Sequence, residues 1–266
     1  MERHKSTGIT ALIAVGLALV LACGSRAAAL PSPSHHPSSA PSPSRYSVLA
    51  FSRTTGFRHD SIQDATELLQ RLGASAGFDV TASEDPSVFT DDFLGQFKVV
   101  VFLLTTGTVL NADQRAAFER FIGRGGGFVG VHSAADTEYD WPWYGQLLGA
   151  WFRSHPAMQE ATIKVEDTVH ASTAALPNPW IRTDEWYNFR TNPRGSVHVL
   201  LTVDETTYKG GGMGVDHPIA WCHEFGGGRS WYTALGHSKG SYTADHAFAI
   251  HLLGGIMWSS GGRGQC

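Results

Sequence analysis

The sequence of 266 residues has little of what marks several protein classes. It carries three cysteines, with no CxxC pair and no zinc-finger spacing, too few for a disulfide framework. Its net charge is -4 and it has no basic run, which argues against a nucleic-acid partner. It also lacks internal repeats and an HExxH motif. The length suits one globular domain with a leader.

The amino terminus lacks an apolar run long enough to span a bilayer comfortably. The run Ile9–Ala22 follows basic residues, as in the core of a signal peptide. The stretch Val20–Cys23, followed by glycine, resembles a bacterial lipoprotein signal. Residues 1–23 are therefore predicted to be a signal peptide that ends at a lipidated Cys23. The alternative is soluble secretion after cleavage at the small-residue run Ala27–Ala29.

Residues 24–45 are rich in proline and serine, a composition that cannot bury a core and is typical of a tether. The folded domain is predicted to cover residues 46–260. We expect an exported protein, either a lipoprotein on the outer face of the bacterial cytoplasmic membrane or a secreted one. Membrane contact is then expected only through the lipid anchor.

Cys222 lies within the apolar strand predicted over Ile219–Phe225. An oxidising compartment would permit a bridge to Cys266. The apolar surroundings nevertheless favour a buried free thiol. They also argue against a nucleophilic role, because reactive thiols lie at loops or helix starts that lower their pKa.

Hydrophobic patterns predict an α/β domain with a doubly wound, mainly parallel sheet, helices on both faces and a strand-rich second half. One helix follows Ser61, whose spacing to Asp64 is that of a capping box, and another is opened by Asn111. A last helix covers roughly Thr243–Trp258, where we expect His251 to be a core histidine. The predicted strands are Val48–Phe51, Phe78–Ala82, Phe97–Leu104, Phe128–Val131, Ala161–Glu166, Val197–Val203, Ile219–Phe225 and Ser230–Leu235.

The most informative segment is Gly125–Asp136, in which a buried strand enters a small-residue turn. Such elbows hold a catalytic nucleophile at the carboxyl edge of a parallel sheet, but the reacting position here is His132. A histidine there indicates acid/base chemistry, metal ligation or a lost activity. Asp136 lies four residues later and is a candidate to orient the imidazole. The structural alternative is an ordinary strand end with a satisfied histidine.

Aromatic and polar residues alternate around the other predicted strand ends, a mixture that suits a sugar ligand. An equally concrete alternative is that the tryptophans and tyrosines fill the core. The stretch Asp184-Glu185 could supply a general acid or base for glycoside cleavage, which typically needs two carboxyl groups, and the alternative is an exposed acidic pair. The candidate substrate-binding residues are Arg58, Asp136, Trp141, His155, Trp186, Tyr187 and His217.

Several histidines lie at predicted element ends, and some of them are expected to meet in space. Together with Glu185 they could bind zinc or a similar divalent ion. No compact ligand motif assigns the ligands. The histidines are His59, His132, His155, His217 and His237.

The chain resembles the trehalose-utilisation (ThuA-like) family, whose domains resemble class I glutamine amidotransferases in fold. The resemblance covers about Ser47 to Ser259. It rests on several long motifs in order, which are Val48–Ile62, Gly130–Asp136, Thr183–Phe189, Asp216–Trp221, Thr233–His237 and His251–Ile256.

The resemblance implies a carbohydrate substrate and places His132 where amidotransferases carry cysteine. Glutamine hydrolysis is not expected, because imidazole does not replace a thiolate. We expect proton transfer or hydrolytic or lytic cleavage of a disaccharide, glycoside or keto-sugar, with His132 and Glu185 as acid/base groups. His59 and His237 would polarise the substrate. The alternatives are a sugar-binding or accessory domain with an inactive elbow, and a metal-dependent hydrolase.

Overall fold

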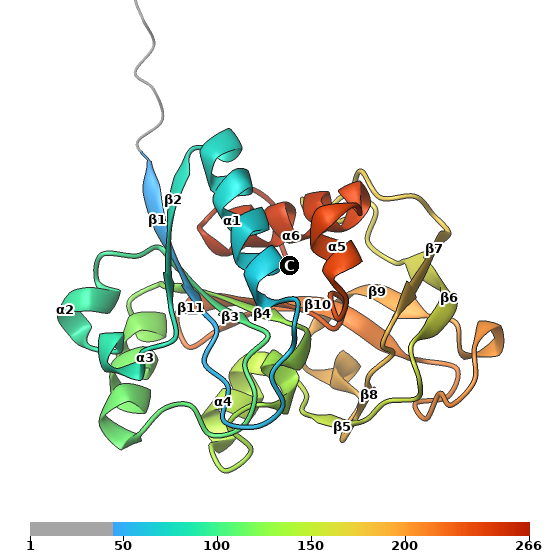
Figure 1. Cartoon of the computed structure of the whole chain (residues 1–266), viewed down its shortest axis with the longest axis horizontal. Helices are drawn as coiled ribbons and strands as arrows, with labels where there is room; N and C mark the ends of the chain where they lie inside the picture. Colours follow the sequence, from blue (N-terminus) through green and yellow to red (C-terminus); the bar gives the residue numbers. More distant parts are fainter. Residues whose placement is uncertain (1–44) are drawn as a thin grey trace, which may run out of the picture. The chain divides into compact units, whose positions relative to one another are not determined.

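The computed structural model describes residues 45–266, so the predicted signal peptide, Cys23 and nearly all of the tether lie outside the described residues. A nine-stranded sheet with the order β2-β1-β3-β4-β11-β10-β9-β6-β7 forms the centre of the domain (Figure 1). A second sheet pairs β5 with β8. The strands are β1 (Tyr46–Phe51), β2 (Phe78–Ser83), β3 (Val99–Leu103), β4 (Gly127–Val131), β5 (Phe152–Ser154), β6 (Gln159–Val165), β7 (Trp180–Asp184), β8 (Asn188–Phe189), β9 (His198–Val203), β10 (Pro218–Phe225) and β11 (Gly228–Thr233).

The main sheet changes character at β11. Strands β2, β1, β3, β4 and β11 are mutually parallel. From β11 to β7, every neighbouring pair is antiparallel. Strand direction therefore alternates, and β7 runs in the same direction as β4 and β11. The predicted α/β sheet with a strand-rich second half is confirmed.

Helices cover both faces of the sheet, as the doubly wound pattern predicts. In Figure 1, α1, α5 and α6 lie above the sheet, and α2, α3 and α4 lie below it. Short 3-10 turns connect other elements, and one of them, His132–Asp136, directly follows β4. The helices are α1 (Ile62–Ala76), α2 (Asp91–Leu94), α3 (Ala112–Gly123), α4 (Pro142–Leu148), α5 (Lys239–Thr243) and α6 (His246–Ser259).

Local capping signals are partly confirmed. Asn111 and Gln114 form the full capping box of α3. Ser61 precedes α1 but makes no side-chain cap bond, and its hydroxyl instead donates to the carbonyl of His237 at 2.8 Å. The last predicted helix, roughly Thr243–Trp258, corresponds to α6, which begins at His246, and the short helix α5 before it was not predicted.

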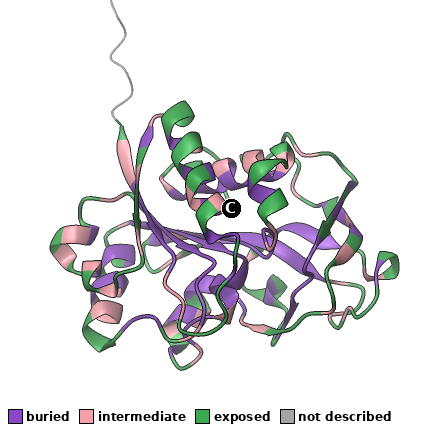
Figure 2. Cartoon of the chain, viewed as in Figure 1, coloured by how far each residue is buried: buried purple, intermediate pink, exposed green. Residues whose placement is uncertain are grey.

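The central strands are buried, while the outer turns of the helices are exposed (Figure 2). Every residue of β3 and β4 is buried, which explains their unbroken hydrophobicity. Within residues 45–266, no helix combines the length and apolarity needed to cross a membrane.

The expectation of a free thiol at Cys222 is wrong. Cys222 in β10 forms a disulfide with Cys266, with the two Cα atoms 5.7 Å apart. The apolar strand pattern described the burial of Cys222 correctly, but it carried no information on where the carboxyl-terminal residue lies. The bridge leaves Cys222 without a free thiolate, so a nucleophilic role is excluded in the disulfide form.

Candidate functional site

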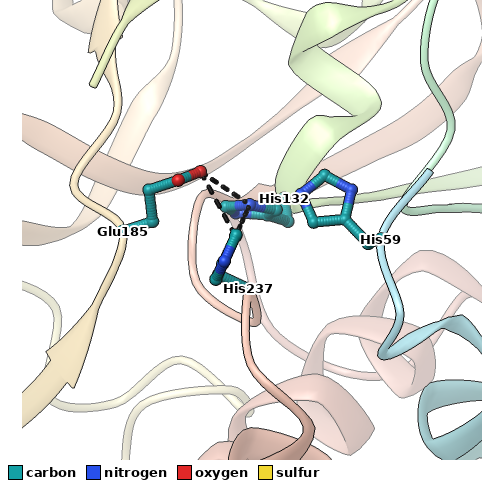
Figure 3. A group of neighbouring side chains, drawn as sticks. All are labelled: His59, His132, Glu185 and His237. Atoms are coloured by element: carbon teal, nitrogen blue, oxygen red, sulfur yellow. Dashed lines mark hydrogen bonds and ion pairs between the residues drawn. The ribbon is translucent and has the colours of Figure 1, made fainter. Parts of the chain in front are cut away.

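Four side chains converge at the carboxyl edge of the sheet (Figure 3). His59 lies in the β1–α1 loop, and His132, Glu185 and His237 follow β4, β7 and β11. Each of the four offers one nitrogen or oxygen atom, and these atoms all lie within 4.8 Å of one another. The predicted convergence of these residues is confirmed.

His132 is held in a strained and fully buried position. Its φ of 52° is rare for a residue with a side chain, and such strain tends to persist at functional sites. The Nδ1 atom lies 2.6 Å from the carbonyl oxygen of Ala234. Since a carbonyl only accepts, Nδ1 donates, and the lone pair of the neutral ring is on Nε2. That nitrogen faces Glu185 and His237.

Asp184 positions two of the four residues. This buried carboxylate accepts from the backbone N–H groups of Glu185 at 2.9 Å and His237 at 3.1 Å. It also accepts from the N–H of Gly236 and from the guanidinium of Arg182, both at 2.9 Å. The predicted acidic pair is therefore split in function, with Asp184 organising the backbone and Glu185 facing the other three residues.

The turn before His237 needs glycine. Gly236 has a φ of 107°, and a Cβ there would lie 2.5 Å from the hydroxyl of Tyr242. Tyr242 donates to the carbonyl of Gly236 at 2.7 Å, which holds the turn. The loop after β11 therefore presents His237 in one arrangement.

Glu185 contacts three imidazoles through its two carboxylate oxygens. Its Oε2 lies 3.4 Å from His132 Nε2 and 3.3 Å from His237 Nδ1. The two nitrogens are 3.3 Å apart. Its Oε1 lies 3.0 Å from Nδ1 of His155. Glu185 is thus the central acidic group of the site.

Burial and mutual contacts shift the pKa values of these groups. Burial, and then the nearby imidazoles of His132 and His237, lower the pKa of His59 to about 3. Burial opposes ionisation of Glu185, but hydrogen bonds with His132 and His237 outweigh it and hold the Glu185 pKa well below its usual range. The contact with Glu185 raises the pKa of His237. At neutral pH the site holds an ionised carboxylate beside a neutral His59.

A cavity of about 170 Å³ opens beside the cluster. Asp136, His155 and Tyr187, which are among the candidate binding residues, line it together with His59, Glu185 and His237. Phe57 and Phe152 also line it and were not among the candidates. Phe152 belongs to the short strand β5, which the sequence pattern did not predict.

A larger cavity of about 620 Å³ lies along β6 and β9. Two of the carboxylates that line it already form ion pairs, Glu166 with Arg194 and Glu205 with His217. The smaller cavity holds the convergent polar groups, and we therefore assign the candidate site to it.

Four predicted binding residues lie elsewhere. Arg58 is exposed and pairs with Glu84 at 2.7 Å. Trp141 is buried, and its Nε1 donates to Glu119 at 3.0 Å. Trp186 is also buried, and its Nε1 donates to the carbonyl of Gln159 at 2.8 Å. The two tryptophans therefore fill the core, which is the common fate of large aromatic side chains.

His217 is the fourth predicted binding residue that does not line the pocket. It is fully buried and bonds the backbone oxygen of Tyr187 through Nε2 at 2.8 Å, so it supports the pocket wall from behind. Asp136 does line the pocket, but it does not orient His132. Its carboxylate accepts from the hydroxyl of Tyr139 at 2.6 Å, because the chain forms a 3-10 turn after His132 in place of the helix that would stack the two residues.

The family model described as ThuA, trehalose utilisation, matches residues 47–259. None of the curated proteins matches the chain. A ThuA-like protein from Bacteroides uniformis is 26% identical, with 84% of this chain and 95% of that chain covered and a TM-score of 0.70. A ThuA-like protein from Parabacteroides merdae is 24% identical, with 84% and 92% covered and a TM-score of 0.66. The chain belongs to the ThuA family of trehalose-utilisation proteins and has its glutamine amidotransferase-like fold.

Proposed function

We propose that this protein is an enzyme that processes a small saccharide in the pocket beside His132 and Glu185. The observation that carries the proposal is the convergence of an ionised carboxylate and three imidazoles at the sheet edge. Such groups move protons at a bound substrate. Membership in a trehalose-utilisation family supports a carbohydrate.

The pocket walls fit one sugar ring. Phe57 and Phe152 offer apolar surface, and the buried Tyr187 supports Phe152, with ring centroids 4.4 Å apart. Glu185, His155 and Asp136 offer polar partners for hydroxyl groups. The volume of about 170 Å³ is below the roughly 300 Å³ at which pockets for drug-sized ligands begin. One ring of a disaccharide, glycoside or keto-sugar therefore enters, and the rest extends from the mouth.

The reaction class is hydrolysis, elimination or isomerisation by proton transfer. Glu185 lines the pocket, and the buried His132 contacts it at 3.4 Å, so the two would share the proton that is transferred. His59 and His237 also line the pocket and are placed to polarise the substrate. Glutamine hydrolysis is not proposed, since histidine stands at the elbow and Cys222 is bonded to Cys266.

Export is part of the proposal. The disulfide supports an oxidising compartment, and the sequence Val20–Cys23 supports a lipid anchor. The Cys23→Ala variant is expected to leave the membrane fraction or to stay unprocessed. Wild-type protein found wholly soluble, with its amino terminus near Leu30, would argue for ordinary secretion.

The test of the activity is product analysis of the purified full chain with trehalose, other disaccharides and 3-keto-glycosides. We expect the wild-type protein to consume at least one of these saccharides, and the Glu185→Gln variant not to consume it. His198→Gln is the matched control, since His198 pairs with a carboxylate on the surface, 2.8 Å from Asp167. A saccharide that binds without turnover would instead support a sugar-binding module, and the absence of both would refute the proposal.

A further inference from the structure

We infer that His132, His237 and Glu185 are the ligands of one divalent transition-metal ion. The inference shares its site with the proposed function and depends on that function in no other way. Its basis is the triangle formed by three atoms: His132 Nε2, His237 Nδ1 and Glu185 Oε2.

The triangle has the dimensions of a coordination site. Its three edges measure 3.4, 3.3 and 3.3 Å. Tetrahedral ligands that each lie about 2.1 Å from a zinc ion are separated by about 3.4 Å. The three atoms therefore already stand where one face of a metal tetrahedron places them, and Figure 3 shows these contacts as dashed lines.

Direct hydrogen bonds among the three side chains explain these distances less well than a bound ion does. Bonds between a charged group and its partner are usually about 2.7 to 2.9 Å long, shorter than all three edges. In addition, Nδ1 of His132 donates to the carbonyl of Ala234, which leaves Nε2 as the ring nitrogen that faces Glu185 and His237. A cation held between the three atoms would replace these long contacts with coordination bonds.

The surroundings of the triangle are those of a metal site. Ligating histidines usually donate their second nitrogen to a backbone carbonyl, which is what His132 does with Ala234. Glu185 is supported through its other oxygen by His155, at 3.0 Å. The two nitrogens and one carboxylate suit zinc, iron, manganese, cobalt or nickel.

His59 borders the remaining position. Its ring stands edge-on to the rings of His132 and His237, with centroids 4.9 and 5.1 Å away. Three protein ligands leave a fourth place for water or a sugar oxygen, which an ion polarises. This arrangement would supply the acid/base chemistry of the proposed function through the ion, with Glu185 as ligand and not as free base.

The test measures metal binding directly. Full-chain protein is stripped with a chelator and titrated with Zn²⁺ and Co²⁺ by calorimetry, and the purified protein is checked by elemental analysis. We expect one ion to bind at the site, and the visible spectrum of Co²⁺ to report nitrogen and oxygen ligands. Glu185→Gln and His237→Gln should each weaken binding by about 100-fold or more, since loss of a mere supporting residue already costs about 10- to 100-fold.

His198→Gln is the matched control and should bind as the wild type does. The sequence also contains His35 and His36, so the readout is the difference between site variants and this control. His237 is partly exposed, and its variant therefore tests the inference even if Glu185→Gln folds poorly. Equal affinity in the wild type and both site variants, or no binding of either ion, would overturn the inference.

The outcomes separate the two proposals. Saccharide turnover by metal-free protein would refute the metal centre and leave the carbohydrate function standing. An ion bound at the triangle, with no saccharide bound or consumed, would refute the carbohydrate function and leave the metal centre.

Discussion

His132 and His251 are both fully buried, and both contact the end of β11, yet their surroundings differ. In each ring, Nδ1 bonds a backbone carbonyl, that of Ala234 for His132 and that of Ser172 for His251. The second nitrogen of His251 meets the hydroxyl of Thr233 at 3.1 Å. His251 is therefore satisfied within the core, as predicted from its place on the apolar helix face.

The second nitrogen of His132 faces Glu185 and His237 instead, beside the pocket. Burial is the same for the two rings, so burial alone does not distinguish a structural histidine from one at a site. The difference lies in what meets the second nitrogen. A neutral hydroxyl only satisfies the hydrogen bonding of a buried ring. A carboxylate together with further imidazoles forms a group of side chains that can hold a proton or a cation.

The largest effect is expected at the pocket. Glu185→Gln keeps the shape of the side chain but removes its charge, so turnover of any saccharide that the product analysis identifies should fall about 100-fold or more. That loss corresponds to about 2.7 kcal/mol of activation free energy. The thermal midpoint should change little. Unfolding of the variant at a much lower temperature, with residual activity per folded molecule intact, would make Glu185 structural.

For the core histidine, we expect stability to fall while turnover stays unchanged. His251→Leu leaves the carbonyl of Ser172 and the hydroxyl of Thr233 without their partner, which should cost about 1 to 3 kcal/mol of unfolding free energy. Denaturant titration measures it. Turnover per folded molecule should match the wild type. A His251→Leu variant that is stable but inactive would contradict the assignment of His251 to the core and of His132 to the site.

The core histidine also predicts a pH dependence. Burial lowers the pKa of His251 to about 3 from 6.5, so the unfolded chain binds the proton more tightly. The resulting stability is complete above pH 6.5 and is lost as pH falls toward 3. One proton gives a slope of at most about 1.4 kcal/mol per pH unit. His251→Leu should flatten the stability profile in this window, and parallel wild-type and variant profiles would contradict this account.

The smallest effect is expected at the surface. His198 is exposed, and its pair with Asp167 is worth less than about 1 kcal/mol. His198→Gln should therefore leave the denaturation midpoint, the turnover and the metal affinity nearly unchanged. A clear loss in any of the three would show that removing a histidine has general effects, and would weaken the inferences drawn from the pocket variants.

Local patterns in the chain were sufficient for much of the fold. The buried strands β3 and β4, the capping box at Asn111 and the elbow at His132 all follow from short stretches of sequence, because side-chain periodicity and capping act over a few residues. His59 and His132 could be placed at one edge because they follow parallel strands. Family motifs added Glu185 and His237.

The remaining features depend on residues far apart in the chain. Strand β7 was not predicted, and only its pairing with β6 and the bonds from Asp184 to the β11 loop bring Glu185 to His132. Trp186 and His217 are of residue types that suit a sugar-binding site, but both side chains are buried in the core. Likewise, the Cys222–Cys266 disulfide joins residues 44 apart. In each case the side chain is directed by packing against distant segments, an interaction that no local pattern of residues encodes.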